Sequence, residues 1–504
     1  MLVNMKFPIF LSLLLLIFSC GSKTNKKILK KKILPNILIF MGDDMNWNDC
    51  EPYGNKIVKT PNIQKLANEG ISLDNMFTST AMCAPSRQQL MTGLYPIRSG
   101  GFPNHSVVYD GVRSFASYFK DIGYEVALIG KKHYGPAESF PINYLGGLQH
   151  DSGKDEDDIF LDKINPIVSG DKPFFLIVAQ NQPHTPWNRG NNKDYSHENL
   201  EIPEYMVDSD LTRKGLSCYY GEITYMDSLL GKTLKIIDDS KKTQNTISIF
   251  TSEQGYIYPF GKWTCYDLGL KTAFIIKWPG KIKPKTRTYA TTQYVDIIPT
   301  LLDAVGQDPL KINVGISDAN GSFGFDGRSF LGVLIGETTN HREYTYCVHT
   351  TRGIINGSES YPIRSIRSNK YKYIQNLNHN QFFYNILTAE DYDRPSFLKD
   401  QEIPPMSIYR SWMKNAKDEN ELQWVKSYQK RPNEELYDLE KDPFEKNNIA
   451  NQPRYDEVKK NMKEKLKIWM KQQGDRGIDT EMMAISRQDR TGKGVWRAYL
   501  KQLK

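Results

Sequence analysis

The alternation of apolar and polar positions along the chain predicts an α/β fold. Five short apolar runs have the length and composition of buried strands, at residues 36–41, 125–129, 174–179, 247–251 and 273–278. Between them lie stretches with helical character, at residues 61–69, 114–122 and 225–237. Strands and helices that alternate in this way predict a large mixed, mostly parallel sheet flanked by helices. Polar ligand sites in such sheets lie beyond the carboxyl ends of the strands.

The pattern changes near residue 340, where a second and smaller domain is expected. Residues 363–367 and 370–374 alternate like two antiparallel strands joined at Ser368-Asn369. A helix is expected at residues 455–472, because four apolar residues recur there at helical spacing and pack as core: Val458, Met462, Leu466 and Met470. We therefore expect three parts: a large α/β domain at residues 35–340, a C-terminal α+β domain built on an antiparallel sheet at 341–475, and a basic tail at 476–504.

The N-terminus has the features of an export signal. Lys6 precedes the apolar run from Phe7 to Phe18, which is too short to cross a bilayer as a helix. Ser19-Cys20 then resembles a lipoprotein cleavage site. The sequence predicts a lipoprotein-type signal at residues 1–20, with Cys20 as the lipidated first residue, and a polar tether at 21–34. An ordinary secretory signal is the alternative. Either way we expect an exported protein of a Gram-negative bacterium, in the periplasm or attached to the outer membrane or cell surface through the lipid.

The composition indicates a globular protein and argues against nucleic acid as a partner. With 39% hydrophobic and 25% charged residues, the 504-residue chain has an ordinary globular composition. Its net charge of +8 suits contact with polyanions, but no helix-turn-helix, zinc finger or aromatic RNA-binding signature is present, so nucleic acid is not an expected partner. Six cysteines are too few for a disulfide scaffold. Four of them have no metal-ligand spacing and are interpreted as structural, with their disulfide pairing left open: Cys50, Cys218, Cys265 and Cys347.

The most specific motif begins at Cys83. Residues 83–93 read Cys-Ala-Pro-Ser-Arg-Gln-Gln-Leu-Met-Thr-Gly and fit the pattern Cys-x-Pro-Ser-Arg-x-x-x-Leu-x-Thr-Gly, by which the chain resembles the formylglycine-dependent sulfatase family. Residues 123–133 resemble the family's second signature, a strand followed by Gly-Lys-x-His. The resemblance covers roughly residues 35–475. It implies an alkaline-phosphatase-like fold and a sulfuric ester hydrolase.

The resemblance also implies how the nucleophile arises. A separate sulfatase-maturating enzyme oxidises Cys83 to formylglycine, whose hydrate carries two hydroxyls on one carbon. One hydroxyl can attack sulfur while the other later expels sulfate, which an unmodified thiol cannot do. Arg87 lies four residues on, hence on the same helical face, where its charge can stabilise the nucleophile and the sulfate oxygens.

Further matches imply the remaining catalytic residues. Lys131 is expected to bind the sulfate and formylglycine oxygens, and His133 to take a proton from the second hydroxyl. His184, in a Pro-His-x-Pro segment, is the candidate general acid for the leaving group, and Lys262 is expected to contact the sulfate and the bridging oxygen. The other histidines have no motif context and are left unassigned: His105, His150, His197, His341, His349 and His379.

In the family, a pair such as Asp43-Asp44 binds one divalent cation, calcium or alternatively magnesium, because hard carboxylate oxygens select such ions. The family usually completes the site with Thr-Ser-Asp, then His or Asn, then Gly. This chain has Thr-Ser-Glu253-Gln254-Gly instead. Both replacements keep oxygen donors on a longer side chain, so we expect an intact site. The expected ligands are Asp43, Asp44, Glu253, Gln254 and the converted residue 83.

The expected substrate is a sulfated polysaccharide or oligosaccharide carrying O-sulfate or N-sulfate. The Glu253-Gln254 variant, with Phe-Gly-Lys-Trp at residues 260–263, resembles heparan N-sulfatase-like members, while algal ulvan, carrageenan and fucoidan stay equally open. Two rival functions remain. A phosphate-ester or phosphonate hydrolase shares the fold but commonly uses Thr or Ser as nucleophile, and a glycan-binding surface protein would bind without turnover.

Overall fold

An eight-stranded sheet forms the core of the computed structural model. Its strands lie in the order β10-β2-β9-β7-β1-β6-β4-β5. They are β1 (Asn36–Gly42), β2 (Ile71–Leu73), β4 (Glu125–Gly130), β5 (Asn143–Tyr144), β6 (Phe174–Ala179), β7 (Thr246–Ser252), β9 (Phe274–Lys277) and β10 (Thr286–Thr288). β1 runs parallel to β6 and β7, and β4 runs parallel to β5 and β6. The prediction of a mostly parallel sheet is confirmed, and β9 is the exception, antiparallel to β2 and β7.

The structure describes residues 33–147, 161–354, 357–388 and 407–488. The expected signal with Cys20, nearly all of the tether, His150 and the tail beyond residue 488 lie outside these ranges. From Pro35 onward the described residues belong to one compact unit. Within the described ranges, no helix combines the length and the apolar character needed to cross a membrane.

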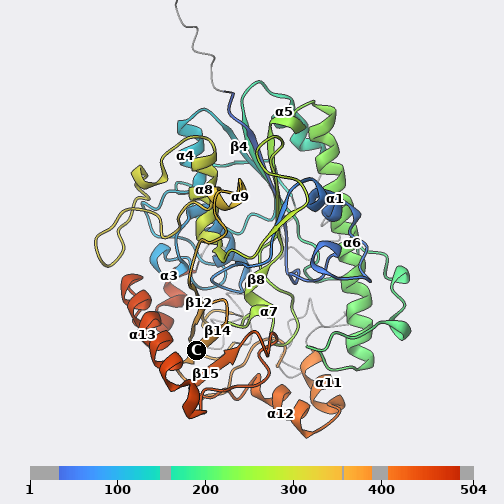
Figure 1. Ribbon diagram of the computed structural model, residues 1–504, viewed down its shortest axis with the longest axis vertical. Helices are drawn as coiled ribbons and strands as arrows, with labels where there is room; N and C mark the ends of the chain where they lie inside the picture. Colours follow the sequence, from blue (N-terminus) through green and yellow to red (C-terminus); the bar gives the residue numbers. More distant parts are fainter. Residues whose placement is uncertain (1–32, 148–160, 355–356, 389–406, 489–504) are drawn as a thin grey trace, which may run out of the picture. The chain divides into compact units, whose positions relative to one another are not determined.

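Helices cover both faces of the large sheet (Figure 1). They include α1 (Pro61–Glu69) and α6 (Asp210–Asp239) on one face, and α4 (Phe115–Asp121) and α8 (Ile297–Ala304) on the other. Successive side chains of a strand point to opposite faces of the sheet, so each strand contacts helices on both faces. Leu38 and Phe40 of β1 share a core cluster with residues of α6. On the opposite face, the Phe175 ring of β6 lies 4.5 Å from that of Phe115 in α4. Both faces are therefore apolar, as buried parallel strands require.

α6 is much longer than the helix expected at residues 225–237. It begins at Asp210, after Ser209, whose side chain accepts a hydrogen bond from the Thr212 backbone N–H. Gly215 and Gly221 lie in the part that the periodicity missed, and glycine disfavours an isolated helix. Here both serve close packing: a Cβ at Gly215 would lie 2.5 Å from the Tyr258 hydroxyl, and one at Gly221 would lie 3.2 Å from neighbouring backbone.

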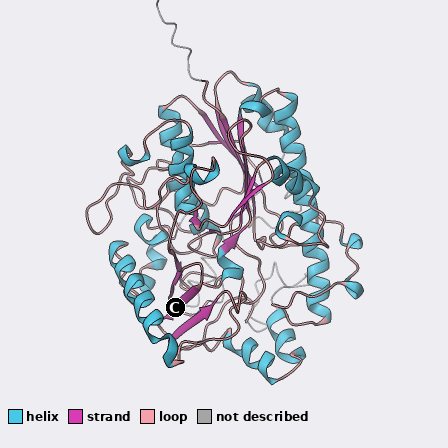
Figure 2. Cartoon of the chain, viewed as in Figure 1, coloured by secondary structure: helices cyan, strands magenta, loops and turns pink. Residues whose placement is uncertain are grey.

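The C-terminal sheet is antiparallel, as predicted (Figure 2). Its strands, in order, are β12 (Thr345–His349), β13 (Ile363–Arg367), β14 (Tyr371–Asn376) and β15 (Glu434–Asp438). α13 (Asp456–Gln472) packs on it through Met462, Leu466 and Trp469. The sheet also reaches the first part of the chain, because the Val348 N–H donates to the Ser79 carbonyl at 2.9 Å.

The remaining elements are shorter. A small sheet contains β3 (Met76–Phe77), β8 (Lys271–Thr272) and β11 (Thr292–Gln293). The other α-helices in the described ranges are α2 (Cys83–Thr92), α3 (Pro96–Ser99), α5 (Asn165–Ser169), α7 (Asp267–Leu270), α9 (Leu331–Leu334), α11 (Ile408–Asn415), α12 (Glu419–Ser427) and α14 (Ile478–Met482). The first residues of the expected tail thus form α14.

Candidate active site

Four neighbouring parallel strands end in polar residues. Asp43 and Asp44 follow β1, Lys131 follows β4, and Glu253 with Gln254 follows β7. β6, which lies between β1 and β4, leads into the segment with His184. Because parallel strands present their carboxyl ends at one edge of the sheet, these side chains meet there.

Helix α2 brings Cys83 to the same edge. Cys83 is the first residue of the helix and 2% exposed, with its Sγ 3.8 Å from Asp43 Oδ1. The helix is held in place by Ser86, whose hydroxyl donates to the Glu253 carbonyl at 2.6 Å. Burial, together with the negative charge of Glu253, raises the pKa of the Cys83 thiol. An unmodified Cys83 is therefore a protonated, unreactive thiol.

Four residues converge closely enough to bind a metal ion. One ligand atom from each of Asp43, Asp44, Cys83 and His184 lies within 4.8 Å of the others. In a converted chain an oxygen would take the place of the Cys83 sulfur. His184 Nε2 lies 3.3 Å from Asp44 Oδ2, and the ring Nδ1 lies 2.8 Å from the Thr185 carbonyl oxygen.

Glu253 and Gln254 occupy different positions around this cluster. The Gln254 amide nitrogen donates to Asp44 Oδ1 at 2.8 Å, while its buried Oε1 has no hydrogen-bond partner. Because amide oxygen and nitrogen are placed by hydrogen bonding, a rotated amide would direct Oε1 at the cluster. The Glu253 carboxylate instead forms an ion pair with Arg87. The residues present fit a hard divalent cation.

Three buried cations balance the acidic residues. Lys131 forms an ion pair with Asp43, Lys262 Nζ lies 2.7 Å from Asp44 Oδ2, and Arg87 Nη2 lies 3.5 Å from Asp43 Oδ2. Burial would raise the pKa of Asp43, but Lys131, Glu253, His184 and Arg87 together outweigh it and hold that pKa well below its usual range. Burial raises the pKa of Asp44, and it raises that of Glu253 to about 8. The pKa values of both lysines rise despite burial, because Asp43 and Asp44 face them.

His133 contacts a residue that the motifs did not identify. Its Nε2 lies 3.2 Å from Nδ1 of His105, which belongs to the loop after α3. Only the tertiary structure brings the two together, because 28 positions separate them and His105 has no motif of its own.

The family follows from sequence similarity. The model of the sulfatase family matches residues 35–307, more than half of the chain. An ulvan-active sulfatase of Formosa agariphila is 32% identical over 450 residues, covering 88% of this chain and 81% of the relative. The chain belongs to the sulfatase family. This sulfatase is therefore a sulfuric ester hydrolase, of a family that uses a formylglycine and a divalent metal ion.

Two further proteins are similar to this sulfatase. Human N-sulphoglucosamine sulphohydrolase is 25% identical over 484 residues, covering 86% of this chain and 89% of the relative. The solved structure of BT4656 in complex with its substrate D-glucosamine-2-N,6-O-disulfate superposes with a TM-score of 0.65 at 21% identity. It covers 89% of this chain and 99% of the other, which confirms the predicted sulfatase fold.

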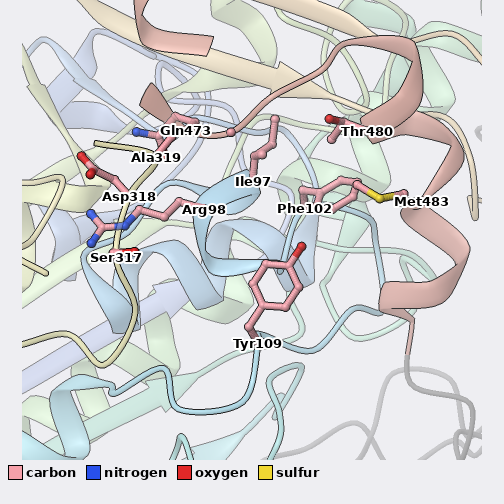
Figure 3. Close-up of a pocket in the computed structure, with 11 residues that line it drawn as sticks. Ile97, Arg98, Phe102, Tyr109, Ser317, Asp318, Ala319, Gln473, Thr480 and Met483 are labelled. Carbon is pink, nitrogen blue, oxygen red and sulfur yellow. The ribbon is translucent and has the colours of Figure 1, made fainter. Parts of the chain in front are cut away.

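Two other features of the sulfatase lie outside this cluster. Cys265 and Cys347 are buried free thiols with Sγ atoms 3.2 Å apart, so the cysteines interpreted as structural include one close pair. A hollow of about 260 Å³ is lined by residues of α3, the loop that follows it, residues 317–319 and 473–474, Thr480 of α14, and Met483 just after α14 (Figure 3). It shares no residue with the acidic cluster, so the chemistry is assigned to the cluster at the strand ends.

Proposed function

We propose that this sulfatase removes sulfate groups from a sulfated polysaccharide or oligosaccharide, with residue 83 converted to formylglycine and one divalent cation bound. The observation that carries the proposal is the buried convergence of Asp43, Asp44 and Cys83 beside Lys131 and Lys262. Anionic ligands hold the cation, and the two ammonium groups suit a sulfate group. The similarity to an ulvan-active sulfatase and to N-sulphoglucosamine sulphohydrolase supports a saccharide carrying O-sulfate or N-sulfate.

The ion would be held by Asp43, Asp44, Gln254 and an oxygen of the converted residue 83. Calcium is the proposed ion, with magnesium as the alternative, because all of these ligands are hard oxygens. When bound, the ion supplies positive charge that polarises the nucleophile. The formylglycine supplies a hydrated aldehyde as that nucleophile. Glu253 is a further proposed ligand, whose carboxylate contacts Asp43 and is paired with Arg87.

Lys131 and Lys262 are proposed to bind the sulfate. Both are buried and both are cations at neutral pH, because their carboxylate partners raise their pKa values. In the structure they neutralise Asp43 and Asp44. A cation on those carboxylates would take over that role, and it would leave the ammonium groups to the sulfate oxygens.

The two histidines are proposed to move protons. With its Nδ1 at the Thr185 carbonyl, His184 directs Nε2 into the cluster, where the protonated ring can donate to the leaving oxygen or nitrogen. His133 is proposed to take a proton from the group at position 83. Arg87 orients Asp43 and Glu253, and it adds positive charge beneath the sulfate.

Export is part of the proposal. The support is the apolar run at residues 7–18 followed by Ser19-Cys20, which suits a lipid-anchored protein of the periplasm or outer membrane. The proposed partners are a sulfatase-maturating enzyme, the membrane through the lipid, and the sulfated glycan.

The test is a screen of sulfated oligosaccharides, with inorganic sulfate release as readout and phosphate esters assayed in parallel. The enzyme is made with and without a co-expressed maturating enzyme, and its intact mass reports conversion of Cys83. We expect sulfate release only from the converted enzyme. Phosphate release without sulfate release would contradict the proposal, as would a converted, calcium-loaded enzyme that binds sulfated glycans without turnover.

A further inference from the structure

His105 meets His133 in a defined geometry. His105 Nδ1 lies 3.2 Å from His133 Nε2, and the rings are edge to face, with centroids 4.9 Å apart and an interplanar angle of 78°. We propose that His105 is a positioning residue for His133: its Nδ1 accepts a hydrogen bond from Nε2–H of His133 and holds that ring in one tautomer. The inference rests on the proposed role of His133 as a proton acceptor.

The backbone of both residues is in an unusual conformation. His105 has φ 55° and His133 has φ 31°, a region that few residues other than glycine adopt. Such conformations persist only where the surroundings hold them, and they concentrate at functional sites. Two facing histidines that share this feature indicate that their contact is built into the fold.

The loop that carries His105 is anchored on three sides. From the helix that begins at Cys83, the Gln88 amide donates to the Ser106 carbonyl at 3.1 Å. From the segment after His133, the Gly135 carbonyl accepts from the Val108 N–H at 2.9 Å. From the C-terminal part of the chain, the Gln488 amide donates to the Asn104 carbonyl at 2.8 Å. These bonds fix the backbone on both sides of His105, so the loop cannot move away from His133 without breaking them.

The role of His133 as a base requires that His133 donates the hydrogen bond and His105 accepts it. A neutral imidazole has one N–H and one lone pair, so a His133 that accepted at Nε2 would carry its proton on Nδ1 and could not act as a base. A His133 that donates from Nε2 has its lone pair on Nδ1, ready for a proton. After protonation the same Nε2–H bond becomes charge-assisted, which stabilises the imidazolium. His105 therefore acts through His133 without touching the substrate.

The experiment compares two substitutions of equal size in the full chain. His105→Asn keeps an acceptor where Nδ1 lies, and His105→Leu removes it. With ¹⁵N-labelled histidine and unconverted Cys83, NMR reads the His133 tautomer, which is assigned from the signal lost in His133→Asn. We expect the Nε2–H form in the wild type and in His105→Asn, and a mixture of tautomers in His105→Leu. His379→Leu, in the turn after β14, is the matched control and leaves the His133 signal unchanged.

Kinetics of the converted enzyme give the second readout. His105→Leu is expected to lower kcat for sulfate release about 10–100-fold with little change in KM. Substitution of a hydrogen-bond partner of a functional histidine typically has an effect of this size. His105→Asn should retain most of the wild-type kcat. An unchanged His133 tautomer in His105→Leu, or a rise in KM at unchanged kcat, would overturn the inference. Absence of sulfate release from the wild type would instead contradict the proposed function and leave the NMR test of the pair standing.

Discussion

Arg87 offers the sharpest quantitative test of the buried charge network. Its side chain is fully buried between two carboxylates, paired with Glu253 and 3.5 Å from Asp43 Oδ2. At that distance and an effective dielectric constant of about 20, the attraction to Asp43 alone is roughly 5 kcal/mol, before the desolvation of both ions is subtracted. Removing one partner of a buried pair typically costs about 3–5 kcal/mol. Arg87→Met should therefore lower the free energy of unfolding by about that amount.

The assay is equilibrium unfolding in urea, in a chelating buffer and with Cys83 unconverted, so that neither ion nor conversion contributes. Arg213→Met is the matched control. It breaks an exposed pair with Asp208, whose Oδ2 lies 2.6 Å from Arg213 Nη2, and should cost no more than about 1 kcal/mol. Adding Glu253→Gln to Arg87→Met should recover about 1 kcal/mol or more, because one uncompensated carboxylate disappears.

The pH dependence sharpens this test. The pKa of Glu253 is already raised to about 8, so in Arg87→Met this carboxyl can take a proton at low pH and avoid a buried charge. Below about pH 8 the carboxyl is protonated in both proteins, so the cost of the substitution should grow only as the pH rises above about 8, where wild-type Glu253 loses its proton and Glu253 of Arg87→Met keeps it. A buried charge network of this strength is excluded if Arg87→Met destabilises no more than Arg213→Met, or if the double variant is less stable than Arg87→Met alone.

Three further outcomes are expected. Cys83→Ala should abolish sulfate release while keeping the thermal midpoint within a few degrees, measured by calorimetry, since the buried thiol makes no strong hydrogen bond. Chelation should stop sulfate release and calcium should restore it; calcium should also raise the thermal midpoint of the wild type but not of Asp44→Asn, and an equal rise in both would exclude Asp44 as a ligand. Burial, only partly offset by Lys372, raises the pKa of Glu445 from its ordinary 4.5 to about 8, so the folded state keeps a proton that the unfolded state loses. Stability should then fall between pH 4.5 and 8 by up to roughly 1.4 kcal/mol per pH unit, and Glu445→Gln should flatten this slope in urea titrations.

Much of the fold could be predicted because the information is local. The apolar runs that became β1, β4, β6 and β7 are strands buried on both faces, and such strands show their character in sequence. Asp43, Lys131 and Gln254 follow these runs directly, so the sequence also predicted that they lie at one edge of the sheet. Cys83 was located by a motif, whose spacing also puts Arg87 on the same face of one helix.

What the sequence could not supply were contacts between segments with no pattern to link them. The first part of α6 contains Gly215 and Gly221, which have a weak helix propensity. Their close packing against neighbouring segments outweighs that propensity, and periodicity does not reveal it.

The sequence by itself thus determined the family, the order of the elements and the residue types at the site. Only the tertiary structure decided that Glu253 pairs with Arg87, and that His105 meets His133. The physical reason is that hydrophobic periodicity and motif spacing describe neighbours along a strand or helix. Contacts between side chains from different loops depend on the path of each loop, which the hydrogen bonds of the folded protein set.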